Sequence, residues 1–258
     1  PQDTPALYSL MNYADMSLGT WYPMGGMHKI IEAMESLARE KGVNFRTNEP
    51  VTQIFRNGSM NVVTDKDTIK SDYVVGGADY HHIETSLLKP EDRQYSSSYW
   101  DRRTMAPSCL LYYVGVDKKL TGLEHHNLFF DTPFDRHAIE IYSDEQWPSN
   151  PLFYVCCPSQ TDPSVAPEGK ENLFILIPIA PGLEGDTDAV RKEYFDKVIA
   201  RIEKHTKQSF SNEILFSESY SIKEFKTDYN SFKGNAYGLA NTLMQTAFLK
   251  PKLRHKKL

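Results

Sequence analysis

The sequence lacks several features that would assign it to a class at once. It has three cysteines, Cys109, Cys156 and Cys157, and two of them are adjacent. Three cysteines cannot form a disulfide framework and no CxxC spacing occurs, so we expect reduced thiols in a cytoplasmic protein. The longest apolar run, Phe174–Ala180, is far shorter than the roughly 20 residues that a membrane-spanning helix needs. No charged segment followed by an apolar run, as in a signal peptide, is visible.

An excess of positive charge is also missing. The 29 Lys and Arg residues are outnumbered by 34 Asp and Glu residues, which gives a net charge of −5. Nucleic-acid-binding proteins typically carry a clustered basic surface, so we expect no nucleic-acid partner. The 258 residues, 40% of them hydrophobic and 24% charged, are typical of a globular protein with one or two domains.

Histidine and cysteine pairs are the first candidates for chemistry. They are His81–His82, His125–His126 and Cys156–Cys157. Adjacent side chains point to opposite sides of a strand, and neither HExxH nor CxxC spacing occurs, so we predict no metal site. Ser108–Cys109 lies in an apolar stretch without a GxSxG turn, and we interpret this cysteine as a small buried side chain.

The first part of the chain predicts one amphipathic helix followed by short strands. Gly25–Gly26 opens a helix from about Met27 to Lys41, and Gly42 stands where a C-terminal cap belongs. Asn57–Gly58 is typical of a hairpin turn. The predicted strands are Val43–Phe45, Val51–Phe55, Met60–Thr64 and Thr68–Val75. We expect them to bury the apolar stripe of the helix, which consists of Met27, Ile30, Ile31, Met34, Leu37 and Ala38.

From about residue 79 the pattern becomes a mixture of longer strands and helices. Asp188–His205 predicts a helix that Thr187 caps, and Phe134–Trp147 leans towards a helix. The predicted strands are Ser108–Val116, Leu128–Phe130, Leu152–Cys157, Asn172–Ile179 and Ile214–Tyr220. The sequence therefore predicts an α+β chain with a boundary at about residues 79–90.

Long strings of the sequence resemble one enzyme family. They are Gly19–Met27, Val43–Ile54, Pro158–Gly169 and Asp228–Pro251. All four resemble the carotenoid desaturases of the bacterial phytoene desaturase type, which are flavoproteins related to FAD-dependent amine oxidases. The resemblance covers essentially the whole chain in family order. It implies a mixed α/β (α+β) fold, with a partial Rossmann-type FAD-binding domain and a substrate domain built on an antiparallel sheet with helices.

The resemblance also implies a division of the chain. Residues 1–24 would be a connecting segment of the substrate domain, 25–78 the returning part of the FAD-binding domain, 79–246 the substrate-binding domain and 247–258 the start of a return to the FAD-binding domain. Family members begin with a strand, a GxGxxG turn and a helix, and they end with a Gly/Pro-rich flavin segment. Neither segment is in this sequence. We therefore expect a fragment of a longer protein, and we expect that it does not hold FAD alone.

The activity that the resemblance implies is FAD-dependent desaturation of phytoene, stepwise towards lycopene. Two alternatives stay open: a desaturase or isomerase of a later carotenoid, and a non-catalytic fragment of such an enzyme. The partners would be a long apolar carotenoid and a membrane surface, to which the full-length cytoplasmic protein would attach peripherally. An apolar surface patch for that attachment is expected in Trp21–Met27 and Tyr95–Trp100. The oligomeric state stays open.

Site residues follow from the same resemblance. Gly25, Gly26 and Val51 would bind the cofactor, with Val51 near the adenine end of FAD. Catalytic residues are not assigned, because no acid or base motif of the family maps onto this sequence. Aromatic and methionine side chains suit a tunnel for a hydrocarbon, and the candidates are Trp21, Tyr22, Met24 and Tyr237.

Overall fold

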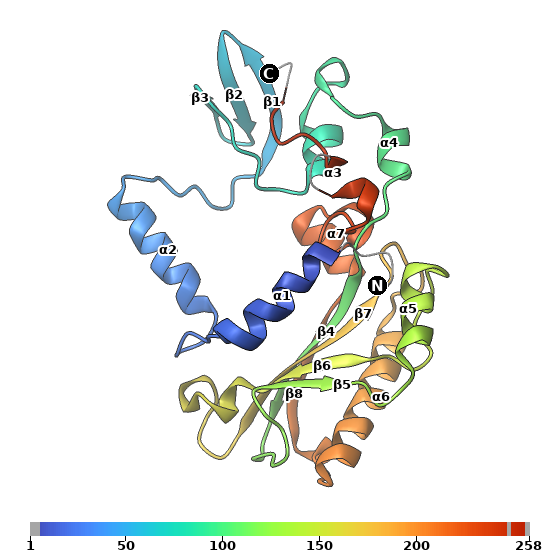
Figure 1. Ribbon diagram of the computed structural model, residues 1–258. Coiled ribbons are helices and arrows are strands. Elements are labelled where there is room, and N and C mark those ends of the chain that lie inside the picture. The colour runs from blue at the N-terminus through green and yellow to red at the C-terminus, as the bar shows by residue number, and fades with distance from the viewer. Residues whose placement is uncertain (1–5, 247–248, 256–258) are drawn as a thin grey trace.

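A computed structural model describes residues 6–246 and 249–255 of the chain. Within these ranges the strands form two antiparallel sheets, one of three strands and one of five (Figure 1). The small sheet has the order β1 (Val51–Asn57), β2 (Ser59–Thr64) and β3 (Thr68–Ser71). Asn57 pairs with Ser59 across the turn, and Gly58 has a φ of +72°, so the predicted hairpin is confirmed.

The small sheet buries its apolar side against the segment that follows it. This segment contains the one-turn helix α3 (Tyr80–His82) and a π-helical turn over Ile83–Leu87. Ile54 and Met60 of the sheet pack with Leu87 and Leu88 of the segment.

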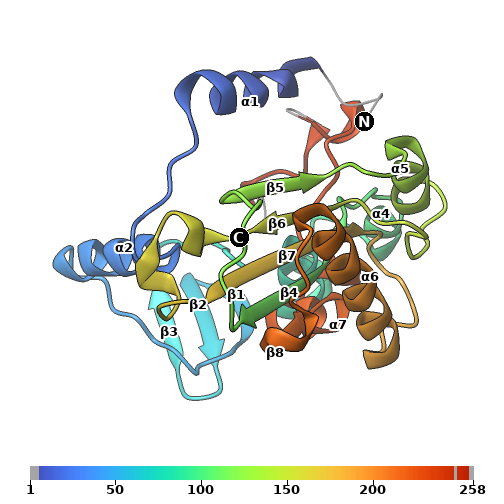
Figure 2. The ribbon, with the colours of Figure 1, turned by 90° about the horizontal axis from the view of Figure 1, so that it is seen from below.

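The large sheet has the strand order β5-β6-β7-β4-β8, with all neighbours antiparallel (Figure 2). Helices α5 and α6 lie on one side of it, while α4 and α7 lie towards the small sheet (Figures 1 and 2). The main core lies between the sheet and α6. The bounds are β4 (Ser108–Val116), β5 (His126–Phe129), β6 (Phe153–Cys156), β7 (Glu171–Ile179), β8 (Ile214–Tyr220), α4 (Ser97–Asp101), α5 (Phe134–Tyr142), α6 (Asp188–Thr206) and α7 (Ile222–Tyr229).

The mixed α/β class with an antiparallel sheet and helices is therefore confirmed. Helix α6 follows its predicted range closely. The hydroxyl of Thr187 accepts a hydrogen bond from the Val190 backbone N–H at 3.3 Å and caps the first turn, as predicted. Tyr194, Val198 and Ile202 lie buried on the face that the sequence pattern indicates.

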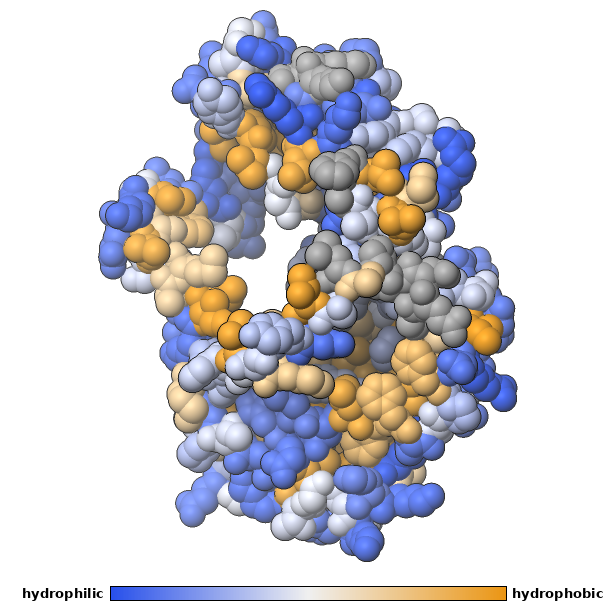
Figure 3. All heavy atoms as spheres, viewed as in Figure 1, coloured by the Kyte–Doolittle hydropathy of each residue, from blue (hydrophilic) through white to orange (hydrophobic). Residues whose placement is uncertain are grey.

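The predicted packing of the first long helix is wrong. This helix, α2 (His28–Glu40), lies entirely within the described range and buries none of its side chains. Ile31 in the middle of its apolar stripe is 57% exposed. The small sheet uses its apolar side for the segment 83–88 instead, and residues 43–45 are irregular chain rather than a strand. Figure 3 shows the apolar side chains of α2 at the surface, beside an opening between this helix and the rest of the molecule.

Preceding α2 is a short helical segment, in which α1 (Leu10–Tyr13) continues into a π-helical turn over Ala14–Leu18. It exposes most of its apolar side chains. The Tyr8 hydroxyl, just before α1, donates to Oδ1 of Asn241 at 2.9 Å, so the beginning of the chain contacts a segment near its end.

Candidate functional site

The large sheet is apolar on both faces. Along β7, burial alternates residue by residue. Leu173, Ile175 and Ile177 belong to the main core, on the face that α6 covers. Phe174 and Leu176 point to the opposite face and are only half-buried. We call this second side the open face. An apolar surface that protein does not cover is a candidate for contact with an apolar ligand.

The strand register identifies the other members of the open face. Phe174 pairs with Tyr113 on β4, and Leu176 pairs with Tyr154 on β6. Tyr154 in turn pairs with Leu128 on β5, which is 67% exposed. The ring centroids of Tyr113 and Phe174 lie 5.4 Å apart, which is within the range of favourable aromatic contacts. The open face is therefore a broad surface of aromatic and aliphatic side chains.

One glycine permits an aromatic ring to lie on the sheet. A Cβ atom on Gly115 of β4 would lie 2.3 Å from Cε1 of Phe216 on β8. Any other residue at this position would displace the ring, because real Cβ atoms do not approach so closely.

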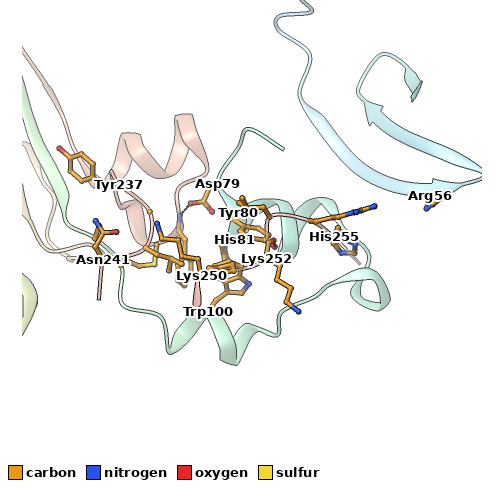
Figure 4. A pocket seen from close by; sticks show the side chains of 18 residues that line it. Arg56, Asp79, Tyr80, His81, Trp100, Tyr237, Asn241, Lys250, Lys252 and His255 are labelled. Atoms are coloured by element: carbon orange, nitrogen blue, oxygen red, sulfur yellow. Dashed lines mark hydrogen bonds between the residues drawn. The ribbon is translucent and has the colours of Figure 1, made fainter. Parts of the chain in front are cut away.

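A pocket of about 1170 Å³ lies between α3, α4 and two segments from the end of the chain (Figure 4). It combines aromatic and apolar side chains with several charged ones. The residues that line it are Arg56, Asp79, Tyr80, His81, Trp100, Met105, Ala106, Phe232, Tyr237, Gly238, Leu239, Asn241, Lys250, Pro251, Lys252, Leu253, Arg254 and His255.

One wall of the pocket is extended chain held by backbone hydrogen bonds. The Ala106 N–H donates to the Gly238 carbonyl at 2.8 Å, and the Ala240 N–H donates to the Thr104 carbonyl at 3.0 Å. The buried amide of Gln245 reinforces this pairing. Its Oε1 accepts from the Thr104 N–H at 3.0 Å, and its Nε2 donates to the Thr104 carbonyl at 2.8 Å and to the Ala240 carbonyl at 3.1 Å.

The opposite wall is aromatic. The ring of His81 stacks on Phe232 with centroids 4.0 Å apart, and Trp100 lies edge-on to Tyr80 at 5.4 Å. Burial lowers the pKa of His81, so this ring is neutral at pH 7. The Trp100 Nε1–H is buried and has no hydrogen-bond partner among the described residues. A buried donor without a partner is costly, so it marks a position where a ligand acceptor would be favourable.

Three side chains hold the elements around the pocket together. The Asp79 carboxylate accepts from the His82 N–H at 3.0 Å, which caps α3, and from the Phe232 N–H at 3.2 Å. The Tyr80 hydroxyl donates to the Lys252 carbonyl at 2.8 Å, while the Tyr95 hydroxyl accepts from the Lys252 N–H at 2.8 Å. The C-terminal segment is thus fixed against α3 and the residues that precede α4.

The charged lining of the pocket is mostly positive. Arg56, Lys250, Lys252 and Arg254 contribute cations, and Asp79 contributes an anion. Figure 4 shows Arg56 and Tyr237 at opposite ends of the pocket. The pocket therefore offers a cationic end for a polar or anionic group and an apolar end beside Tyr237.

Tyr237 joins the pocket to the open face. It lines the pocket, and its hydroxyl lies 3.8 Å from Sγ of Cys109 on β4, which pairs with Pro178. Burial raises the pKa of Cys109 to about 11, and burial together with the neighbouring thiol raises the pKa of Tyr237 to about 12. Both groups are therefore protonated at neutral pH. This junction is suited to binding an apolar chain rather than to removing a proton.

The structure brings one of the four predicted tunnel residues to this site. Tyr237 lines the pocket, whereas Trp21, Tyr22 and Met24 are not among its lining residues. Trp21 is 88% exposed, and the ring of Tyr22 lies edge-on to His125, 4.6 Å away. The tunnel role of these three residues stays a prediction.

The predicted cofactor residues belong to different elements, since Gly25 and Gly26 precede α2 and Val51 belongs to β1. The Gly25 N–H donates to the Asp162 carboxylate at 2.6 Å, and a Cβ on Gly26 would lie 3.7 Å from Val165. Val51 begins β1, beyond the 13-residue helix α2, which is about 20 Å long. Their role in cofactor binding stays a prediction.

The open face and most of the pocket were not predicted from the sequence. One signal for the open face is present in the sequence. Residues 172–179 are apolar at nearly every position, whereas a strand with one solvated face would alternate. Trp100 and His81 carry no such signal, because their neighbours in the pocket come from segments far away in the chain.

Comparison with known proteins places these features in a family. The family model of flavin containing amine oxidoreductases matches residues 1–257. A carotenoid 3,4-desaturase from Haloarcula japonica is 43% identical over 98% of this chain and 52% of its own length. A zeta-carotene-forming phytoene desaturase from Myxococcus xanthus is 28% identical over 97% of this chain and 49% of its own length.

A solved oxidoreductase from Methanosarcina mazei has a similar fold, with a TM-score of 0.59 and 17% identity over 83% of this chain and 47% of that protein. The chain spans about half the length of the curated relatives that it matches. Because the family model covers nearly all of the chain, the chain belongs to the family of flavin containing amine oxidoreductases.

Proposed function

We propose that the protein containing this chain is an FAD-dependent carotenoid desaturase, and that the open face and the pocket bind the hydrocarbon chain of its substrate. The observation that carries this proposal is the apolar character of both faces of the large sheet, of which the helices in the described ranges cover only one. The similarity to carotenoid desaturases over nearly the whole chain supports the same substrate class.

The physical properties of a carotenoid match such a surface. A long hydrocarbon has no polar group to recognise, so affinity must come from shape and buried apolar area, at about 25 cal/mol per Å². Strand β7 has nine residues and is therefore about 30 Å long. Its side chains Phe174 and Leu176 give a long, flat contact surface, which suits an extended substrate better than a compact one.

FAD is the cofactor that the family implies, and the pocket fits a polar part of it. The buried Trp100 Nε1–H lacks a partner within the described ranges, and Arg56, Lys250 and Lys252 lie around the same pocket. These donors suit the carbonyl edge of a flavin ring or a diphosphate. When bound, FAD would supply the hydride acceptor for the formation of a C=C bond, while the second hydrogen would leave the substrate as a proton to solvent. The side chains of this chain would orient the substrate and exclude water.

Binding of FAD by this chain alone is expected to be weak, because its sequence has no GxGxxG turn. Equilibrium dialysis of the 258-residue chain and of the complete protein against FAD tests this expectation. Tight binding by the short chain would contradict it.

Catalytic groups are not assigned in this proposal. The Asp79 carboxylate is engaged by two backbone N–H groups, and Tyr237 and Cys109 hold their protons at neutral pH. For this chain we therefore propose binding and positioning rather than proton transfer.

The identity of the carotenoid is the finer part of the proposal. The 43% identity to a carotenoid 3,4-desaturase favours a later carotenoid, while phytoene desaturases at 27 to 32% identity keep phytoene as the second candidate. Liposomes loaded with phytoene or with lycopene, incubated with the FAD-loaded complete protein, separate the two. A product with a longer conjugated system and a lower mass supports desaturation. An isomer of equal mass, or no product from either substrate with FAD bound, would contradict it.

A further inference from the structure

Three side chains of residue types that can bind metals meet at one end of the open face. One donor atom each from His125, His126 and Cys156 lies within 4.8 Å of the others. His126 of β5 pairs directly with Cys156 of β6. The chain bends at His125, just before β5 begins, so the alternation expected of adjacent strand residues does not hold here. The two imidazole rings lie with centroids 4.4 Å apart.

Neighbouring groups hold both rings in place. Nδ1 of His125 lies 2.6 Å from the Thr161 hydroxyl, and Nδ1 of His126 lies 2.6 Å from the Tyr154 hydroxyl. The edge-on ring of Tyr22 packs against His125. Outer hydrogen bonds of this kind are typical of metal-binding histidines, because they fix the ring that carries the ligand.

We propose that His125, His126 and Cys156 form a Zn²⁺ site. Two imidazole nitrogens and one thiolate are a donor set that zinc prefers, and three protein ligands leave a fourth position for water. In a tetrahedral site the donor atoms lie about 3.5 Å apart, so the side chains must draw together by about 1 Å. As the Zn–S bond forms, the thiol proton of Cys156 passes to solvent. His126 is exposed and His125 is half-buried, so the ion can enter from the surface.

The ion would fasten the N-terminal connecting segment to the large sheet. Tyr22 contacts the ligand His125, and the neighbouring Gly25 N–H is held by Asp162, one residue after Thr161. Zinc bound at this point restrains β5 and β6, the loop that contains Thr161 and Asp162, and the segment that contains Tyr22 and Gly25. We therefore expect Zn²⁺ to raise the melting temperature of the protein.

The test uses the complete protein after removal of metals with a chelator. Titration calorimetry with Zn²⁺ is expected to show a site that Cys156→Ser and His126→Ala each weaken at least tenfold. Co²⁺ is expected to give a thiolate-to-metal absorption band that Cys156→Ser abolishes. Circular dichroism melts without metal check that the variants are folded.

Matched controls come from the neighbouring pairs. Cys157 is adjacent to Cys156 but points into the core, where its Sγ lies 3.7 Å from a Glu171 oxygen, and His82 belongs to another histidine pair. Cys157→Ser and His82→Ala are expected to bind Zn²⁺ as tightly as the parent protein. The proposal is overturned if no Zn²⁺ binds, or if the ligand variants bind it no more weakly than these controls.

Discussion

Under the proposed function, single side chains on the open face determine its affinity for a hydrocarbon. Leu128 lies on this face in the edge strand β5 and is 67% exposed, so a polar replacement changes the surface without opening a cavity. Leu128→Glu places a charge where the proposed substrate lies, which costs the desolvation of that carboxylate. We expect KM for the carotenoid to rise at least tenfold, with the melting temperature nearly unchanged.

The control for this variant is Ile139→Glu. Ile139 is 52% exposed on α5, on the other side of the sheet, and the substitution adds the same charge. Steady-state kinetics on carotenoid-loaded liposomes compare the two variants. Equal KM values for them would show that the open face does not bind the substrate.

A buried ion-pair network makes stability depend on pH. The Arg191 guanidinium donates to the two oxygens of Asp186 at 2.7 and 2.8 Å and to Glu224 at 2.7 Å, and the side chains of Arg191 and Asp186 are each only 8% exposed. Burial alone would raise the pKa of Asp186, but the hydrogen bonds from Arg191 and from the Lys223 N–H lower it. Asp186→Asn removes the negative charge beside Arg191. We expect it to lower the free energy of unfolding by about 3 kcal/mol at pH 7.

The sign of the pH effect follows from the lowered pKa. The stability that Asp186 contributes is fully present above its unfolded pKa of about 3.9 and is lost as pH falls through the folded value. The free energies of unfolding of the parent and of Asp186→Asn, measured with a denaturant, should therefore converge as the pH falls below about 4. Asp196→Asn removes an exposed partner of Lys192 and should change the free energy of unfolding little at any pH. A constant difference between the parent and Asp186→Asn down to pH 2 would contradict the assignment.

The three thiols are expected to differ in reactivity. Burial raises the pKa of both Cys109 and Cys157 to about 11, so each is almost entirely thiol at pH 8. Burial also raises the pKa of Cys156, but this side chain is partly exposed and a reagent can reach it. Alkylation of the metal-free protein at pH 8, followed by peptide mapping, should label Cys156 first. Faster labelling of Cys109 or Cys157 would contradict the burial seen here.

At the scale of elements, α2 differs most from what its sequence predicts. Ile31→Asp in a buried stripe would cost several kcal/mol, but Ile31 is 57% exposed here. In the 258-residue chain we therefore expect Ile31→Asp to change the free energy of unfolding by no more than about 0.5 kcal/mol. Ile199→Asp in α6, where the side chain is buried, should cost about 4 kcal/mol or more.

The same pair of variants in the complete protein tests whether the stripe is covered there. We propose that it is, because an apolar stripe on a surface helix normally faces a partner. A large loss of stability from Ile31→Asp in the complete protein, together with none in this chain, is the expected result. Equal small effects in both would show that the stripe stays exposed.

Elements with strong local signals were predictable from the sequence. Helix α6 has a regular apolar period and a threonine cap, and the Asn57–Gly58 turn specifies its hairpin. The partner of α2 was not predictable, because periodicity shows which face is apolar but not what covers it. Likewise, residues 43–45 carry a strand-like pattern, but no strand in the described part of the chain pairs with them.

The pocket was hidden from the sequence for a similar reason. Its walls bring together Asp79 with Phe232, Tyr80 with Lys252 and Thr104 with Gln245, which are contacts between distant parts of the chain. Tyr237 was predicted only because its sequence context resembles a family, not because a local pattern marks it.

At the scale of the whole molecule, the pocket depends on the closure of the C-terminal segment over α3 and α4. Gln245 makes three hydrogen bonds with Thr104 and Ala240, and its amide is buried. Gln245→Ala removes all three hydrogen bonds and leaves backbone groups unpaired. We expect this to lower the free energy of unfolding by about 1 to 3 kcal/mol. Hydrogen exchange should then increase at residues 236–240. Unchanged protection there would show that the backbone pairing alone holds the wall.

The whole molecule also exposes apolar side chains along its N-terminal part. Met16, Leu18, Trp21 and Met24 are all largely exposed, whereas Trp100, expected to contribute to a surface patch, is buried. None of the helices in the described ranges is long and apolar enough to cross a membrane. We propose that the Met16–Met24 segment contacts the lipid surface from which a carotenoid substrate is taken up. A tryptophan and a methionine that enter the interface each contribute about 1.5 to 3 kcal/mol.

Replacing Met16 and Trp21 together by Ser should therefore lower the vesicle partition coefficient of the complete protein at least tenfold. Co-sedimentation with neutral lipid vesicles at high salt measures this, because screening leaves apolar contacts intact while it weakens electrostatic ones. The matched control replaces Tyr73 and Val75, an equally exposed apolar pair after the small sheet, by Ser. If both double variants lose the same amount of binding, or if the parent protein does not sediment with vesicles, the N-terminal segment is not the membrane contact. Loss confined to the Met16 and Trp21 variant is expected, since only that pair belongs to the exposed segment that adjoins the open face through Tyr22 and His125.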